Sequence, residues 1–320
     1  MLVLWNSIQS VLVIVLIMAL GYVLRKEKWL SDSFGNDIAR LILNISLPAA
    51  IFVTVLEKLN RGELASFSGY LLLGVIAFAI SYVLSIVWAR VAHVGTGRIG
   101  TFINGITNPN TVFIGLPLNV ALFGNQSLTY FLVYYVLDVF STWTAGLFIV
   151  NSDDPTTKNK KTYLDWHKIL PVPLLAFIIA IVVLLFNIPI LKITFVKSSL
   201  TYIGSLVTPL SLIYIGIILA NAGLKNMRFD LDTVMVMIGR FVCVPAIMIG
   251  VLLVAMKFAT LPKLLTQTMV IQSAVPAIAV LPILVHNAHG DVKFSANVVS
   301  ISTVMFIVVI PILMFVIQYL

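Results

Sequence analysis

The sequence predicts an all-α polytopic membrane protein, and three observations support this fold class. Of the 320 residues, 60% are hydrophobic and only 10% are charged, and the mean hydropathy is +1.09. Soluble globular proteins carry about 25% charged residues, so a soluble chain of this length could not cover its core with so little polar surface. The apolar residues also come in runs of about 20 or more, the length of helix that crosses a bilayer.

Ten membrane spans are predicted from these runs. They cover roughly residues 2–24, 37–56, 67–89, 98–123, 128–150, 169–187, 199–223, 231–256, 264–286 and 295–319. The first run has no basic residue ahead of it and no cleavage site, so no cleavable signal peptide is expected. The single cysteine, Cys243, excludes a disulfide framework and a cysteine-based metal site.

The basic residues predict the orientation, because cytoplasmic loops retain Lys and Arg. With the N-terminus outside, the inner loops hold thirteen basic residues and the outer loops hold six, while Arg240 lies within a span. Both termini are therefore expected outside the cell membrane. The net charge of +8 resides mainly in short loops between apolar runs, so it indicates topology and not a nucleic-acid partner.

One long hydrophilic stretch divides the spans into five and five. The chain is thus expected to consist of a first repeat (1–150), a cytoplasmic linker (151–168) and a second repeat (169–320). An odd number of spans in each half makes related halves an inverted repeat, as in many secondary transporters. Three proline pairs recur at offsets of 161, 167 and 165 residues, namely Pro48 and Pro209, Pro109 and Pro276, and Pro117 and Pro282.

Spans 4 and 9 carry the residues that are expected to interrupt a helix. Span 4 contains Asn104, Thr107, Asn108, Pro109, Asn110, Thr111, Gly115, Pro117 and Asn119, and span 9 contains Gln272, Ser273, Pro276 and Pro282. Proline removes a backbone donor, and unpaired backbone groups at membrane depth are tolerated only inside protein or beside water. Two crossing breaks would direct half-helix N-termini at one point and form an anion site. The alternative is a pair of packed, kinked helices without a ligand.

Two formal charges lie deep in predicted spans, Asp138 in span 5 and Arg240 in span 8. Each costs at least about 2.5–3.5 kcal/mol at the centre of a lipid-facing helix, so both should face protein or water. Asp138 is a candidate for proton or ion coupling, and Arg240 is a candidate for electrostatic attraction of an anion. In the alternative interpretation, each charge is satisfied by a neighbour, or by the other, and serves packing only.

At these motifs the chain resembles the auxin efflux carrier family, which includes PIN-formed auxin exporters of plants and malate-permease-like bacterial proteins. The resemblance covers essentially the whole chain and is most specific at NPNTVFIGLPL (Asn108 to Leu118). Three further stretches agree in order, namely SLPAAIF (Ser46 to Phe52), GRFVCVPA (Gly239 to Ala246) and SAVPAIAVLP (Ser273 to Pro282). Span 9 departs from many bacterial relatives, because Ala277 to Val280 replace an Asn-Thr pair after the first proline.

The resemblance implies two inverted five-helix repeats like those of bile-acid:sodium symporters. Spans 1, 2, 6 and 7 would form a scaffold, and spans 3–5 and 8–10 a transport domain with broken, crossing helices 4 and 9. It also implies elevator-type movement and a homodimer through the scaffold. Asn110 would hold the substrate carboxylate, and the full set of predicted substrate-binding residues is Asn108, Pro109, Asn110, Thr111, Pro117, Gln272, Ser273 and Pro276.

The function expected from these observations is secondary transport of a small organic carboxylate. The long hydrophilic loop of many plant exporters is absent, so a malate-like anion is favoured over auxin. A sodium-coupled organic-anion symporter of the same fold and a non-transporting membrane sensor are the alternatives. Two isolated charges do not make a catalytic cluster, so no enzyme activity, cofactor or metal is expected, and the partners are the anion, the bilayer and a second copy of the chain.

Overall fold

The computed structural model describes residues 2–31, 33–59, 63–154, 172–222 and 227–317, and most of the predicted 151–168 linker lies outside these ranges. Helices account for the regular structure of the described residues. The first half contains α1 (Leu2–Lys26), α2 (Phe34–Leu41), η1 (Ile42–Ser46), α3 (Leu47–Lys58), α4 (Glu63–Val91), α5 (Ile99–Thr107), η2 (Thr111–Gly115), α6 (Leu116–Phe123), η3 (Asn125–Ser127), α7 (Leu128–Ser141), η4 (Thr142–Gly146) and α8 (Leu147–Ser152).

The second half of the chain is also helical over its described residues. It contains α10 (Val172–Leu185), η5 (Ile190–Lys192), α11 (Thr194–Ser205), α12 (Val207–Ala222), α13 (Leu231–Ile238), η7 (Gly239–Cys243), α14 (Val244–Ala255), α15 (Lys263–Ser273), α16 (Leu281–Asn287) and α17 (Val292–Ile317). Every described α-helix overlaps one of the ten predicted ranges.

Six of the described helical stretches are long and apolar enough to cross a membrane. They are Phe34–Glu57, Phe67–Val91, Leu128–Ser152, Thr194–Asn221, Leu231–Ala255 and Val292–Ile317, and two shorter apolar helices cover Thr111–Phe123 and Val172–Leu185. The chain is therefore an all-helical, polytopic membrane protein over the part that the structure describes. The count of ten crossings and the inverted repeat stay predictions.

Three of the helices widen into a π-helical turn just before a proline. The turns η1, η2 and η7 each end two residues before a proline, at Pro48, Pro117 and Pro245 respectively. A proline has no N–H to donate to the preceding turn, and its ring collides with the carbonyl four residues back. A wider turn relieves both problems, so the helix continues through the proline instead of ending there.

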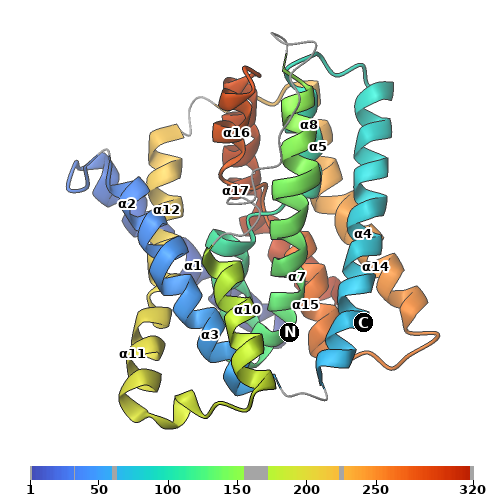
Figure 1. Ribbon diagram of the computed structural model, residues 1–320. Helices are drawn as coiled ribbons and strands as arrows, with labels where there is room; N and C mark the ends of the chain where they lie inside the picture. The colour runs from blue at the N-terminus through green and yellow to red at the C-terminus, as the bar shows by residue number, and fades with distance from the viewer. Residues whose placement is uncertain (1, 32, 60–62, 155–171, 223–226, 318–320) are drawn as a thin grey trace.

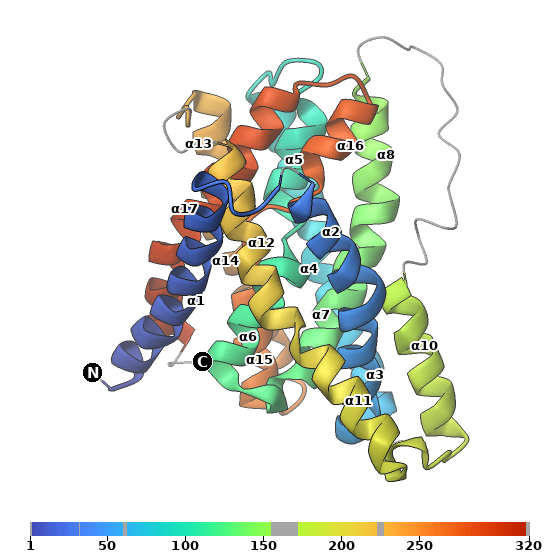
Figure 2. The ribbon, with the colours of Figure 1, turned by 90° about the vertical axis from the view of Figure 1, so that its left-hand side faces the viewer.

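The helices form two groups (Figures 1 and 2). The first group, called the α1–α12 layer, contains α1, α2, α3, α10, α11 and α12, in which α1 packs on α12 and α3 packs on α10 and α11. The second group, called the crossover group, contains α4 to α8 and α13 to α17. Helix α1 begins and α17 ends toward the same end of the bundle, the lower end in Figure 2.

Glycines allow α1 and α12 to approach closely within the first layer. A Cβ atom on Gly216 would lie 2.0 Å from the carbonyl oxygen of Met18, and one on Gly21 would lie 2.3 Å from that of Ile213. Real side chains never reach such distances to backbone, so both positions exclude even a methyl group. Small residues at helix contacts are the usual means by which membrane helices bring their backbones together.

Candidate functional site

The two predicted helix breaks are present, and the structure brings them together. Helix α5 ends at Thr107, two residues before Pro109, and α15 ends at Ser273, three residues before Pro276. The residue before a proline disfavours the helical conformation, which explains why each helix stops there. The Asn110 N–H donates to the Pro276 carbonyl at 2.7 Å, and the Ile278 N–H donates to the Asn108 carbonyl at 3.0 Å.

These two bonds form an isolated antiparallel bridge between Pro109 and Ala277. We call residues 108–110 and 275–278 the crossover. Backbone groups at membrane depth cannot rely on water, so each broken helix supplies partners for the other. The Ala277 N–H is also satisfied, because it donates to the Ser302 hydroxyl of α17 at 3.1 Å. The extended segments are thus held by hydrogen bonds and are not loose loops.

Asn110 presents a buried donor at the crossover. Its Oδ1 atom accepts from the Phe113 N–H at 3.3 Å and so caps the start of η2. The residue is only 2% exposed, and its Nδ2 atom has no hydrogen-bond partner among the described residues. Leaving a buried donor unpaired costs about 1–3 kcal/mol, so such a group calls for an explanation. A bound acceptor supplies one.

Asn108, by contrast, is fully engaged by its neighbours. Its Nδ2 atom donates to Asn104 Oδ1 at 2.7 Å, and its Oδ1 atom accepts from the Ser141 hydroxyl at 2.7 Å. The Tyr82 hydroxyl lies 2.8 Å from Ser141 Oγ and about 3 Å from the Asn108 amide. Through Tyr82 and Ser141, this network ties the crossover to α4 and α7. It also uses the side-chain amide of Asn108, which was predicted to bind substrate.

Asp138 lies beside the start of the half-helix that follows the break. The Thr111 hydroxyl donates to one of its carboxylate oxygens, and the Thr142 hydroxyl lies 3.5 Å from the other. Asp138 is 3% exposed. Thr111 is the first residue of η2, where free N–H groups give a helix end a partial positive charge that favours a carboxylate. The structure therefore brings Asp138 and Thr111 together, next to Asn110.

The predicted residues of span 9 contribute mainly through backbone. Gln272 Nε2 donates to the Gly115 carbonyl of η2 at 2.9 Å, whereas its Oε1 atom is buried without a partner in the described part of the chain. The Ser273 hydroxyl donates to the Val270 carbonyl of its own helix at 2.6 Å. A Cβ on Gly115 would lie 2.3 Å from Gln272 Oε1, so a side chain there would require the Gln272 amide to shift. Pro117 is buried in the first turn of α6.

Arg240 is completely buried and does not face an open site. Its Nη1 atom donates to the Ile106 carbonyl at 2.7 Å, and its Nη2 atom donates to the Ser273 carbonyl at 2.5 Å. Both Arg240 and Asp138 are described, and no ion pair within 4.0 Å joins them. The Arg240 Nε atom is buried and has no hydrogen-bond partner among the described residues, and direct attraction of substrate by Arg240 stays a prediction.

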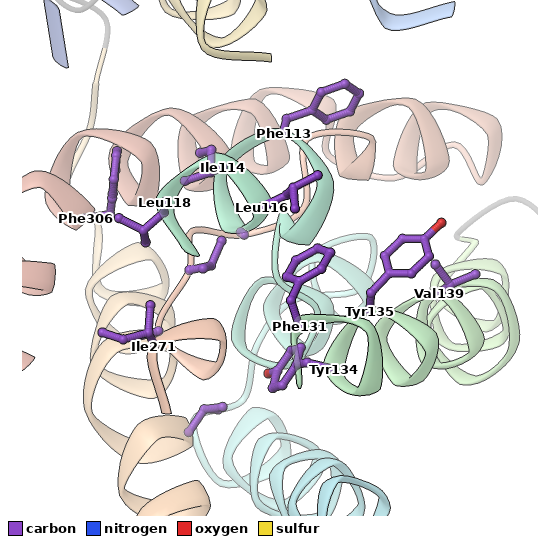
Figure 3. Packing of buried hydrophobic residues seen from close by; sticks show 14 of the residues in the cluster. Phe113, Ile114, Leu116, Leu118, Phe131, Tyr134, Tyr135, Val139, Ile271 and Phe306 are labelled. Atoms are coloured by element: carbon purple, nitrogen blue, oxygen red, sulfur yellow. The ribbon is translucent and has the colours of Figure 1, made fainter. Parts of the chain in front are cut away.

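Apolar side chains enclose the half-helix that carries these groups. Figure 3 shows residues of η2 and α6 packed among those of α7, α15 and α17. The labelled side chains are Phe113, Ile114, Leu116, Leu118, Phe131, Tyr134, Tyr135, Val139, Ile271 and Phe306. Dense apolar surroundings lower the local dielectric, which strengthens the few polar contacts made inside.

A cavity of about 220 Å³ lies where the α1–α12 layer meets α6 and α7. Most of its wall is apolar, and its polar side chains come from the α1–α12 layer, namely Thr54, Glu57, Thr201, Ser205 and Thr208. The crossover group contributes Leu116, Val120, Leu128, Phe131 and Leu132. The cavity thus lies between the two groups of helices, beside α6, which follows the crossover and η2 along the chain.

The loop end of α5 is fixed by aspartates. Asp153 accepts the Gly97 and Gly100 N–H groups at 2.9 and 2.8 Å, and burial raises the pKa of its carboxyl even though these bonds oppose the rise. Arg98 binds Asp230, Asp232 and Asp291 at 2.9–3.1 Å. Within the described residues, no group of three His, Cys, Asp or Glu side chains is arranged to hold a metal ion.

Several residues around the crossover were not predicted from the sequence. They are Tyr82, Ser141, Thr142 and Ser302. Ser141 and Thr142 follow Asp138 by three and four positions and share its helix face, so their spacing was a usable signal. Tyr82 and Ser302 lie in apolar runs beside other small polar residues, and nothing in the local pattern separates them from ordinary polar residues of a membrane helix.

Comparison with known proteins gives one family. The sequence model of a family described as "Membrane transport protein" matches residues 6–169 and again residues 154–314. An uncharacterized transporter of Methanothermobacter thermautotrophicus is 22% identical over 310 residues, which cover 96% of this chain and 97% of the relative. An uncharacterized transporter of Methanocaldococcus jannaschii is 22% identical over 305 residues, which cover 94% and 95% of the two chains.

Proposed function

Because the chain belongs to the membrane transport protein family, the family of the auxin efflux carriers, we propose that it is a secondary transporter of a small organic carboxylate anion. The observation that carries the proposal is the buried Nδ2 atom of Asn110, which has no partner among the described residues. This donor lies directly before the positive end of the η2–α6 half-helix. A carboxylate oxygen is the acceptor that satisfies both features.

The α1–α12 layer offers a second polar contact to the same ligand. The Ser211 hydroxyl of α12 is buried and has no partner among the described residues. Tyr214, three residues later on the same helix face, packs against Phe113 of η2 with ring centroids 4.6 Å apart. Because Ser211 shares this face of α12, we expect its hydroxyl to face the η2 side and to meet the substrate from the layer that opposes the crossover.

The architecture proposed for transport is an inverted pair of five-span repeats. The support is the recurrence of proline at near-constant offset, the pairing of the two breaks and the helix order common to both halves. In this proposal the α1–α12 layer is the scaffold and the crossover group is the transport domain. The crossover group would carry the anion past the scaffold in an elevator-type movement, and two copies would associate through their scaffolds.

The proposed orientation places both termini outside and the 151–168 linker in the cytoplasm. A cysteine introduced at Lys160, after replacement of Cys243 by serine, should react with a membrane-impermeant maleimide only in inside-out vesicles. Labelling of intact cells would contradict this orientation. Lys160 itself lies outside the described residues, so the test uses the linker only as a chemical marker.

The function is tested by counterflow in proteoliposomes. The purified chain is reconstituted, loaded with one unlabelled acid and supplied with labelled mono- and dicarboxylates in turn, malate among them. We expect trans-stimulated uptake of at least one carboxylate, and loss of that uptake in Asn110→Ala liposomes. Uptake that requires an inward sodium gradient would instead favour the sodium-coupled symporter, and specific binding without any uptake would favour the sensor.

A further inference from the structure

Arg240 connects two helix ends that come from opposite halves of the chain. It lies in the π-helical turn η7, and its two terminal nitrogens donate to Ile106 at the end of α5 and Ser273 at the end of α15. Helices α5 and α15 are the segments that stop at the crossover. The η7 turn therefore holds both helix ends at once through the Arg240 side chain, which is fully buried.

The chemistry of the contact matches the charge of the helix ends. The last carbonyls of a helix have no partner within the helix, and each helix C-terminus carries roughly half a negative charge. Two such ends together balance the single positive charge of one guanidinium. The planar guanidinium also presents its donors in a rigid fork, so one side chain can hold two carbonyls in a fixed relation.

The backbone of η7 is built to approach α5 at this point. A Cβ on Gly239 would lie 2.7 Å from Cγ1 of Ile106, so a larger residue would push η7 away from the carbonyl that Arg240 binds. Arg240 also makes a side-chain contact with the Tyr134 hydroxyl of α7. No carboxylate lies within 4.0 Å of Arg240 among the described residues.

We propose that Arg240 is a positioning residue of the transport site: it fixes the ends of α5 and α15 so that residues 108–110 and 275–278 stay paired and the Asn110 amide faces the substrate. Arg240 does not touch the anion. The proposal rests on the proposed function for its effect on binding, whereas its effect on the pairing of the two segments is independent of any substrate.

The test is hydrogen–deuterium exchange of the full chain in nanodiscs, without ligand. Arg240→Lys is the main variant, because lysine keeps the charge but has no rigid fork for two carbonyls. Arg240→Gln is the second variant. Arg98→Lys is the matched control, because Arg98 binds aspartates at the loop end of α5, away from the crossover.

In Arg240→Lys we expect peptides that contain residues 108–111 and 275–279 to exchange about tenfold faster or more, both together, because one charge-assisted bond is lost. Peptides of α4 should exchange as in the parent, and Arg98→Lys should leave both segments unchanged. Faster exchange confined to residues 236–244, faster exchange of the whole chain, or no change in either segment would overturn the proposal.

Binding separates this proposal from the proposed function. The ligand is a carboxylate identified by counterflow. Arg240→Lys introduced alone should lower the affinity for this carboxylate. Introduced together with Asn110→Ala, it should add little to the loss caused by Asn110→Ala, because Arg240 acts through the Asn110 amide. Full additivity of the two losses would show that Arg240 acts on the anion by another route and would overturn the proposal. If Asn110→Ala binds normally while both segments still exchange faster in Arg240→Lys, the proposed function fails and the positioning role stands.

Discussion

Replacement of Asn110 separates the two tasks that this side chain performs. Its Nδ2 atom is the unpaired donor proposed for the carboxylate, and its Oδ1 atom caps η2 through the Phe113 N–H. Asn110→Ala removes both groups, whereas Asn110→Ser removes the long amide donor but keeps an oxygen suited to capping. Serine and asparagine are about equally good at the N-cap position of a helix.

The expected magnitudes differ for the two tasks. A hydrogen bond to a charged group contributes about 1.5–3 kcal/mol, so loss of the donor should weaken carboxylate binding about 10- to 150-fold in both variants. Loss of a cap costs about 0.5–2 kcal/mol. The 3.3 Å separation between Asn110 Oδ1 and the Phe113 nitrogen is long for a hydrogen bond, which favours the lower end of that range for Asn110→Ala.

The assay is titration calorimetry of detergent-solubilised protein with a transported carboxylate, beside thermal unfolding without ligand. We expect Asn110→Ala to bind weakly and to unfold slightly earlier than the parent, and Asn110→Ser to bind as weakly while unfolding like the parent. Parent-like affinity in Asn110→Ala would refute the donor. Parent-like affinity in Asn110→Ser alone would show that the cap, and not the amide donor, supports binding.

Three further predictions follow from other contacts. An anion that arrives beside Thr111 repels a charged Asp138, so binding of the anion should take up a proton. The affinity for an anion of constant ionisation should then rise from pH 8 to pH 5. Equal pH dependence in Asp138→Asn would exclude the Asp138 carboxyl as the coupling group. Gly216→Ala forces α1 and α12 apart and should cost about 1–3 kcal/mol of stability, seen as a lower Tm, while Gly69→Ala, which meets nothing within 4 Å, should match the parent. Burial opposes ionisation of Asp230, but hydrogen bonds from Thr233 and Arg98 outweigh it and hold the pKa of that carboxyl below its ordinary value of 3.8. A carboxyl with a lowered pKa stabilises the fold above its unfolded pKa, so Tm should fall as the pH drops below about 3.8, and less so in Arg98→Met.

Much of the fold could be predicted because bilayer crossing imposes a simple pattern. Runs of apolar residues located the helices, since a chain in lipid must satisfy its backbone within a helix. Proline located both breaks, at Pro109 and Pro276, because it restricts the residue before it. The π-helical turns were not predicted, although Pro48, Pro117 and Pro245 stand at the same distance after three of them. The sequence shows the missing N–H but not whether the helix will end or widen.

Candidate residues of the site could be predicted where they adjoin the helix break in the sequence. Contacts that depend on the packing of separate helices could not be predicted. Asn110 and Thr111 were singled out because they follow the break directly and match the Pro-Asn-Thr stretch of the resembling family, and their role in binding stays a prediction. The full engagement of Asn108 by Tyr82 and Ser141 was not, since those residues come from separate helices and their approach depends on tertiary structure. A buried amide at a break indicates a polar environment, but only its neighbours show whether any of its hydrogen-bonding capacity is left for a ligand.

The two buried charges of the membrane spans, Arg240 and Asp138, both contact groups at helix ends. Arg240 faces the carbonyl ends of α5 and α15, and Asp138 faces the N–H end of η2 through Thr111, so each charge meets helix ends of the opposite sign. Arg240 and Asp138 thus each contribute to holding the crossover together, and in our proposal neither is the group that retains the anion. A carboxylate would instead be bound by a neutral amide and a half-helix N-terminus. Such donors attract an anion more weakly than an unpaired arginine would, which suits a site that must release its ligand on the other side of the membrane.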